Sequence, residues 1–235
     1  IKSYTIDIDN KIAGVASDVI LLEELIKSND VFNIVDGDLV YTSVSAQDNL
    51  TKDIYDWINV NTDYDQIRIL DTNGMEMIRV NYNEGNPVVV DTVDLQDKGD
   101  RYYFTNAIDL ADDYIYLSKL DLNVENGMIE YVGEKPKAML RIASTIYNDD
   151  GEQIGLLIVN YLANKLFHDE ETKTGEFTAF EVINQDGYFL HSFHDEKEFG
   201  FMFPEQLDET FEKYHDYDIF ETESQNVIQQ IFKGE

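Results

Sequence analysis

Apolar residues recur near the start of the chain in alternating steps of four and three. These positions are Ile8, Ile12, Val15, Val19, Leu22 and Ile26. The spacing lines one stripe of an α-helix over about the first 27 residues. The stripe would pack either on the chain's own domain or, as a heptad seam, against the same helix of a second copy. Both alternatives stay open, because Ile20, Leu21 and Leu25 add a second apolar flank.

From residue 31 the chain consists of short β-rich runs separated by turns. Residues 67–70 and 75–80 flank the turn Asp71-Thr-Asn-Gly74, which predicts a hairpin. The other expected elements are a helix over 101–110 and strands over 114–117, 138–145, 154–160, 178–184 and 188–192. A shift of 113 positions places residues 69–74 on residues 182–187. We therefore expect two similar α+β units in tandem, the second much smaller.

The expected domain limits follow from this pattern. Residues 1–30 form the N-terminal helix, residues 31–165 the large unit and residues 166–235 the small unit. The most polar stretch between the units, residues 165–174, marks the boundary. Three prolines in the whole chain are too few for a flexible proline-rich linker.

Composition narrows the classes of function. Asp and Glu number 48 against 17 Lys and Arg, a formal charge of −31 that repels nucleic acid and anionic lipid. Apolar residues at 43% support a folded core, and the absence of cysteine excludes disulfides and cysteine zinc sites. The strongest apolar run, Ile154–Val159, has only strand length. No signal peptide opens the chain, and its start at Ile1 instead of Met predicts a segment cut from a longer protein.

Signals of catalysis and of metal binding are weak. His191 and His194 are three positions apart, an odd separation that sends strand side chains to opposite faces. Acidic pairs such as Asp36 and Asp38 lack the glycine and closing glutamate of a helix–loop–helix cation loop. We expect no catalytic residue, cofactor or metal. The alternatives to this expectation are a secreted acidic calcium-binding module and a hydrolase with carboxylate catalysis.

Three stretches resemble a known family. They are Leu95-Gln-Asp-Lys-Gly-Asp-Arg-Tyr-Tyr-Phe104, Tyr116-Leu-Ser-Lys-Leu-Asp-Leu-Asn123 and Lys135-Pro-Lys-Ala-Met-Leu-Arg-Ile-Ala-Ser144 with its sequel 151–163. Their order and spacing resemble the double Cache family, the tandem PAS-like sensor domains of bacterial and archaeal transmembrane receptors. Residues 186–190 and 198–202 are similar to the membrane-proximal unit of that family. The resemblance implies a large membrane-distal unit and a small, shortened membrane-proximal unit, both α+β with antiparallel sheets.

The same resemblance implies a function. The domain would be extracytoplasmic, periplasmic or extracellular, and would be joined to the membrane only by flanking helices outside this sequence. It would sense a small molecule without catalysing a reaction, and would form a homodimer through its N-terminal helix. The attached output would be a histidine kinase or a GGDEF diguanylate cyclase, with a chemoreceptor as the alternative.

The resemblance also implies a ligand site between the central sheet and the segment that contains Arg101. A guanidinium can hold a carboxylate through two parallel hydrogen bonds, so Arg101 is the expected anchor and Tyr103 an aromatic wall. Amino-acid-sensing members have an aspartate at the place of Asn160, so we expect a small carboxylate without specifying an amino acid. The other expected lining residues are Tyr116, Ser118, Asp121, Asn123 and Arg141.

Three of these residues have structural alternatives. Arg101 could form a surface ion pair, Tyr103 could belong to the core, and Arg141 could pair with a nearby carboxylate.

Overall fold

A computed structural model describes residues 2–112, 114–125, 127–148, 150–167, 181–192 and 194–214, without the side chains of 2–9 and 195. The side chain of Ile8 in the predicted stripe lies outside this description, and so does much of the range 166–235, including residues 178–180 of an expected strand. The chain divides into two compact units. We call residues 12–118 and 141–161 the sheet unit, and the described parts of 1–11, 119–140 and 162–235 the hairpin unit. The expected domain ranges stay a prediction, and residues 119–140 group with the C-terminal part of the chain.

The predicted N-terminal helix is present as α1, Lys2–Ser28. Its stripe packs within the sheet unit: the buried side chains are Val15, Val19, Leu22 and Ile26. Glu23, also buried, accepts a 2.7 Å hydrogen bond from the Ser144 hydroxyl and pairs with Lys27 at 2.6 Å. The alternative of packing on the chain's own domain is therefore confirmed for residues 15–26. Ile20 and Leu21 remain 46% and 51% exposed.

A second long helix, α2 (Val44–Val60), was not expected from the sequence. Its signals are nevertheless present. The Ser43 hydroxyl caps the helix by accepting the Ala46 N–H at 3.1 Å. Three apolar residues at four-residue spacing face the core: Leu50, Ile54 and Ile58. The helix expected over 101–110 is shorter, because α3 spans only Tyr102–Thr105 and turns follow it.

The sheet unit contains the antiparallel sheet that positions the site. Its strand order is β5-β4-β3-β13-β12-β6, and the predicted hairpin is β3–β4. Bounds in this sheet are β3 Tyr64–Leu70, β4 Glu76–Asn81, β5 Val88–Val89, β6 Ile115–Leu117, β12 Ala138–Tyr147 and β13 Gln153–Leu162. Gly74 turns the hairpin at φ +94°, and a Cβ there would lie 2.3 Å from the Gly99 Cα. The strands expected over 114–117, 138–145 and 154–160 are confirmed as β6, β12 and β13.

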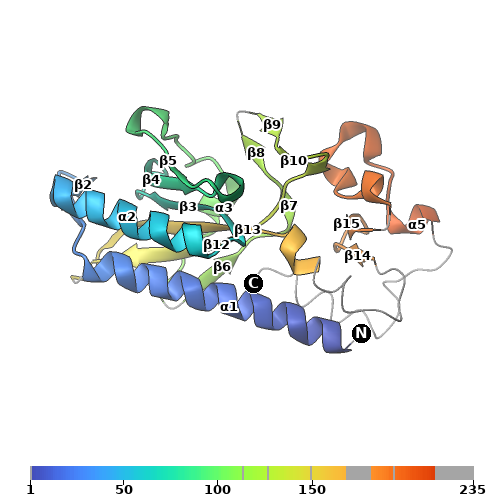
Figure 1. Ribbon diagram of the computed structural model, residues 1–235, viewed down its shortest axis with the longest axis horizontal. Coiled ribbons are helices and arrows are strands. Elements are labelled where there is room, and N and C mark those ends of the chain that lie inside the picture. The colour runs from blue at the N-terminus through green and yellow to red at the C-terminus, as the bar shows by residue number, and fades with distance from the viewer. Residues whose placement is uncertain are drawn as a thin grey trace. The chain divides into compact units, whose positions relative to one another are not determined.

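Side-chain alternation gives this sheet two different faces. Ile67 and Ile69, both fully buried, alternate with Arg68 and Leu70 and so lie on one face of the sheet. Figure 1 shows α1 and α2 running along one side of the sheet. α1 is tied to that side by the Tyr64 hydroxyl, which donates to the Asp18 carboxylate. Arg68 and Leu70 point to the opposite face. There α3 and the turn after it cover an apolar cluster: Leu70, Tyr103, Phe104, Ala107, Ala143, Leu156 and Ile158.

The hairpin unit is built from short antiparallel pairs and single turns. Its strands are β7 Asp121–Leu122, β8 Val124–Glu125, β9 Met128–Ile129, β10 Tyr131–Val132, β11 Lys135–Pro136, β14 Val182–Ile183 and β15 Phe189–His191. The pair β14–β15 matches the second strand–turn–strand expected from the sequence. A small core of Ile183, Phe189 and Phe211 joins this pair to α5, Phe211–Tyr214.

Two further strands pair with each other, β1 Phe32–Val35 and β2 Asp38–Tyr41. The structure also has single turns of 3₁₀ helix: η1 Asn83–Gly85, η2 Thr92–Asp94, η3 Asp195–Lys197, η4 Gly200–Met202 and η5 Pro204–Gln206. Within the described part of the chain, none of the helices has the length and apolar character needed to cross a bilayer.

Candidate functional site

Three arginines lie buried in the sheet unit. Arg68 on β3 is 2% exposed, Arg79 on β4 is 7% exposed and Arg141 on β12 is 5% exposed. Arg68 and Arg79 are direct cross-strand partners and so share the face that α3 covers. Burying a charged group is costly unless it is paired and hydrogen-bonded. The partners of these guanidinium groups therefore decide what this face can bind.

Glu76 on β4 is the carboxylate between two of the arginines. Its side chain is fully buried, with one oxygen 3.7 Å from Arg68 Nη1 and the other 3.2 Å from Arg79 Nη1. The Gln96 N–H donates to Glu76 Oε2 at 3.0 Å. Arg79 also donates to the Asp94 carbonyl at 3.3 Å. One carboxylate thus balances two guanidinium charges, which leaves this group of three side chains with a net positive charge.

Asn160 on β13 orients Arg68. The Arg68 Nη2 donates to the Asn160 amide oxygen at 2.8 Å, and Asn160 Nδ2 donates to Gln66 Oε1 at 3.1 Å. All three side chains are at least nine-tenths buried. This chain of amides fixes the plane of the Arg68 guanidinium. The Nε of Arg68 is buried and has no hydrogen-bond partner among the described residues.

Tyr103 of α3 lies between two of the buried arginines. Its ring centroid is 5.5 Å from the Arg68 guanidinium carbon and 5.0 Å from that of Arg141. These distances are within the range of cation–π attraction. The Tyr103 hydroxyl also accepts from Arg68 Nη1 at 3.4 Å, and the Tyr102 hydroxyl accepts from Arg141 Nη1 at 3.5 Å. The start of α3 thus closes over the arginines with two tyrosines.

The residues expected from the sequence divide into four groups. Tyr103, Arg141 and Asn160 lie in the buried cluster around Arg68. Arg101, the expected anchor, precedes α3, with its side chain 41% exposed and its Nε 3.9 Å from the Asp100 carboxylate.

Ser118 and Tyr116 are on or next to β6, beside β12. The Ser118 hydroxyl accepts the Arg141 N–H at 2.9 Å, and the half-buried Tyr116 packs against the apolar cluster under α3.

Asp121 and Asn123 belong to the hairpin unit. Asp121, on β7, pairs with Met139 in the ladder to β12, and it is buried. Asn123, which is also buried, donates from Nδ2 to the Glu130 carboxylate at 2.8 Å. Asn123 therefore braces the strands of its own unit.

Arg68 was not among the residues expected from the sequence. The available signal was an arginine between Ile67 and Ile69 in a strand that is otherwise largely apolar. That pattern was also consistent with an ordinary half-exposed strand.

The two histidines that the structure describes each lie beside a glutamate. His191 Nδ1 lies 3.2 Å from Glu198, and His194 Nδ1 lies 3.5 Å from Glu196. Across the described residues, no group of three or more His, Cys, Asp or Glu side chains could hold a metal ion.

Comparison with known proteins gives the family. The family model described as "Bacterial histidine kinase, sensor domain" matches residues 23–217, well over half of the chain. No curated protein matches this chain in sequence.

Solved structures share the fold. A domain of a protein assigned to the sensory box/GGDEF family of Vibrio parahaemolyticus has a TM-score of 0.75 at 21% identity, covering 93% of this chain and 78% of that one. The extracellular domain of an assigned histidine kinase, vpHK1S-Z8, has a TM-score of 0.74 at 21% identity, covering 93% and 74%. The sensory domain of the Campylobacter jejuni chemoreceptor Tlp3 with isoleucine bound has a TM-score of 0.57 at 15% identity, covering 83% and 68%. This chain belongs to the bacterial histidine kinase sensor domain family.

Proposed function

We propose that this sensor domain binds a small organic carboxylate in the sheet unit, next to Arg68 and Tyr103. The domain lies outside the cytoplasm, and its signal passes through flanking membrane helices to a histidine kinase, or else to a diguanylate cyclase. The sensor domain itself has no catalytic role. The alternative of a chemoreceptor differs only in the attached output.

The charge balance around Glu76 carries this proposal. Arg68 and Arg79 share that single buried carboxylate, so a second anion on this face would complete the pairing. The unpartnered Arg68 Nε is a fixed donor that a ligand oxygen could use. The hydrogen bond from Arg68 to Asn160 holds the guanidinium plane in place. A planar, oriented guanidinium suits a carboxylate better than a point charge does.

The same contacts favour a simple carboxylate over an amino acid. An ammonium group needs an anionic or strongly accepting partner. The Asn160 side chain is neutral, and its oxygen already accepts from Arg68. The Glu76 carboxylate already pairs with two arginines. Because the Tlp3 structure contains isoleucine, amino acids are the natural comparison in a test.

A thermal-shift panel would test the proposal. Acetate, pyruvate, succinate and citrate would be compared with L-isoleucine and L-serine on this domain. A ligand at one hundred times its Kd stabilises the fold by about 2.7 kcal/mol, which is readily measured. We expect at least one carboxylate to stabilise the fold with a shift that depends on Arg68, and neither amino acid to give a shift that depends on Arg68.

Two matched variants would locate the site. Arg68→Lys keeps the positive charge beside Glu76 but loses the planar pair of donors, so we expect at least a tenfold rise in Kd. Arg101→Lys makes the same change at the anchor expected from the sequence. If only Arg101→Lys weakens carboxylate binding, the ligand binds at Arg101 instead of Arg68. Unchanged binding in both variants would refute the proposal.

We also propose that two copies pair through α1. Its stripe over residues 15–26 is buried within the sheet unit, so the surface available to a second copy includes Ile20 and Leu21. A formal charge of −31 on each copy opposes association at low salt. We expect sedimentation to show a dimer that strengthens with sodium chloride and weakens in Leu21→Asp. A monomer at every salt and protein concentration would contradict this.

A further inference from the structure

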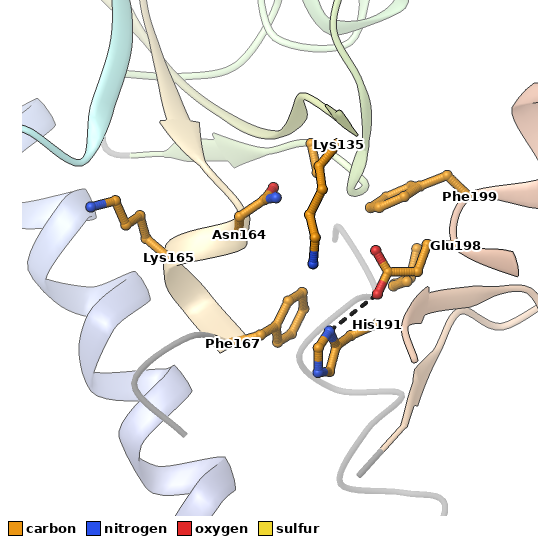
Figure 2. A pocket seen from close by; sticks show the side chains of 9 residues that line it. Lys135, Asn164, Lys165, Phe167, His191, Glu198 and Phe199 are labelled. Atoms are coloured by element: carbon orange, nitrogen blue, oxygen red, sulfur yellow. Dashed lines mark ion pairs between the residues drawn. The ribbon is translucent and has the colours of Figure 1, made fainter. Parts of the chain in front are cut away.

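The hairpin unit contains a cavity that the proposed function does not use. It has a volume of about 330 Å³, at the lower end of the range of about 300–1,000 Å³ typical of ligand pockets. All nine residues that line it belong to the hairpin unit. Figure 2 shows side chains from several separate segments of that unit converging on one space.

One side of the cavity is apolar and rigid. Phe167, Leu190 and Phe199 are 4%, 3% and 3% exposed. The Phe167 ring stacks on the His191 imidazole, with centroids 5.3 Å apart and planes at 15°. The backbone of Phe199 is left-handed at φ +57°, and its N–H donates to the Phe189 carbonyl at 2.7 Å. A bulky residue adopts this φ at a cost, so the surrounding contacts hold the Phe199 ring in position.

The other side of the cavity carries both signs of charge. Glu198 Oε1 accepts from the Ser192 N–H at 2.8 Å and lies 3.2 Å from His191 Nδ1. These two contacts fix the carboxylate, whose side chain is 15% exposed. In Figure 2 the Lys135 ammonium points into the same space, and the Asn164 amide lies beside it. The Lys165 side chain, by contrast, extends away from the cavity.

We infer that this cavity is a binding site for a compact zwitterion with an apolar body. The ligand carboxylate is held by Lys135, and the ligand ammonium by Glu198, which His191 and Ser192 orient. The apolar body rests on Phe167 and Phe199. Such a ligand pairs with both charged groups at once, whereas a simple anion or cation pairs with only one of them. This site is distinct from the Arg68 cluster in residues, in unit and in ligand charge.

Three probes of similar shape would test the inference by calorimetric titration of the whole domain. L-leucine carries both charges, 4-methylpentanoate lacks the ammonium and 3-methylbutylamine lacks the carboxylate. We expect L-leucine to bind at least tenfold more tightly than either of the others. Failure of L-leucine to bind, or equal binding of all three probes, would overturn the inference.

Variants would assign each charge. We expect Glu198→Gln to weaken L-leucine at least tenfold and to leave 4-methylpentanoate unchanged, because this substitution keeps the size of the side chain but removes its charge. Lys135→Met should weaken both ligands. Lys165→Met is the matched control, since it removes the same charge from a side chain directed away from the cavity.

The two sites can be separated in the same titrations. Arg68→Lys should leave L-leucine binding unchanged, whatever becomes of the carboxylate site in the sheet unit. Loss of L-leucine binding in Arg68→Lys, or equal losses in Lys135→Met and Lys165→Met, would contradict a site at this cavity.

Discussion

Glu76→Gln is the sharpest test of the buried charge arrangement in the sheet unit. The substitution keeps the shape of the side chain and an acceptor for the Gln96 N–H, and removes only the negative charge. Arg68 and Arg79 would then face each other across the ladder with no carboxylate between them. The change therefore isolates the electrostatic contribution of one residue.

The magnitude follows from the two distances. At an effective dielectric constant of about 20, charges separated by 3.7 Å and 3.2 Å attract by about 4.5 and 5 kcal/mol. Desolvation of the buried carboxylate offsets part of this attraction, and breaking a buried pair costs about 3–5 kcal/mol net. For a chain of this size, that loss lowers Tm by about 6–20 °C.

Urea unfolding would measure the effect. Trp57 is the only tryptophan of the chain and lies on α2, so its fluorescence reports on the sheet unit. Glu24→Gln is the matched control, because Glu24 is exposed on α1 and its charge should contribute less than about 0.5 kcal/mol.

Adding Arg79→Met to Glu76→Gln restores the original net charge of the group. The double variant should therefore lose less stability than the sum of the single losses. If the free energy of unfolding of Glu76→Gln is within about 1 kcal/mol of that of the unmodified chain, the inferred role of Glu76 is wrong.

Other substitutions test the packing and the pH dependence. Gly155→Ala places a Cβ 2.2 Å from the Leu70 carbonyl oxygen, so the free energy of unfolding should fall by about 1–3 kcal/mol or more; an unchanged urea midpoint would refute this close approach. Gly14→Ala lies on the exposed face of α1, with no atom within 4 Å of the new Cβ. It should raise the free energy of unfolding by about 0.5–1 kcal/mol, and a lower free energy of unfolding would show that this face is covered. Burial raises the pKa of Tyr41 from 10.0 to about 12. The unfolded chain therefore loses this proton first, and stability that is complete below pH 10 decreases as the pH rises toward 12. Tyr41→Phe should reduce that decrease in alkaline melting curves, and an identical pH profile would contradict it.

The strands could be predicted because their signals are local. Two apolar runs around Gly74 specify the β3–β4 hairpin, and the run Ile154–Val159 specifies the centre of β13. The helix α2 was missed although Ser43 caps it and Leu50, Ile54 and Ile58 follow at helical spacing. Only three of its 17 residues are buried, so its apolar signal is thin compared with that of the strands.

The candidate site could be predicted only in part. Tyr103, Arg141 and Asn160 were expected from a family resemblance, and the structure places them around Arg68. Arg68 itself follows an alternation that is equally typical of a side chain facing solvent. It became a buried charge because α3 covers the second face of the sheet, and that covering depends on contacts between residues about 35 positions apart.

The sequence by itself determined the order of the main strands, the N-terminal helix and the strongly acidic surface, because each depends on near neighbours or on composition. Tertiary structure alone decided which charges are buried and what faces them. Glu76 meets Arg68 through the register of two strands, and His191 meets Glu198 through the folding back of a short segment. Pairing of this kind is set by three-dimensional packing, where the low dielectric makes every unpaired charge expensive.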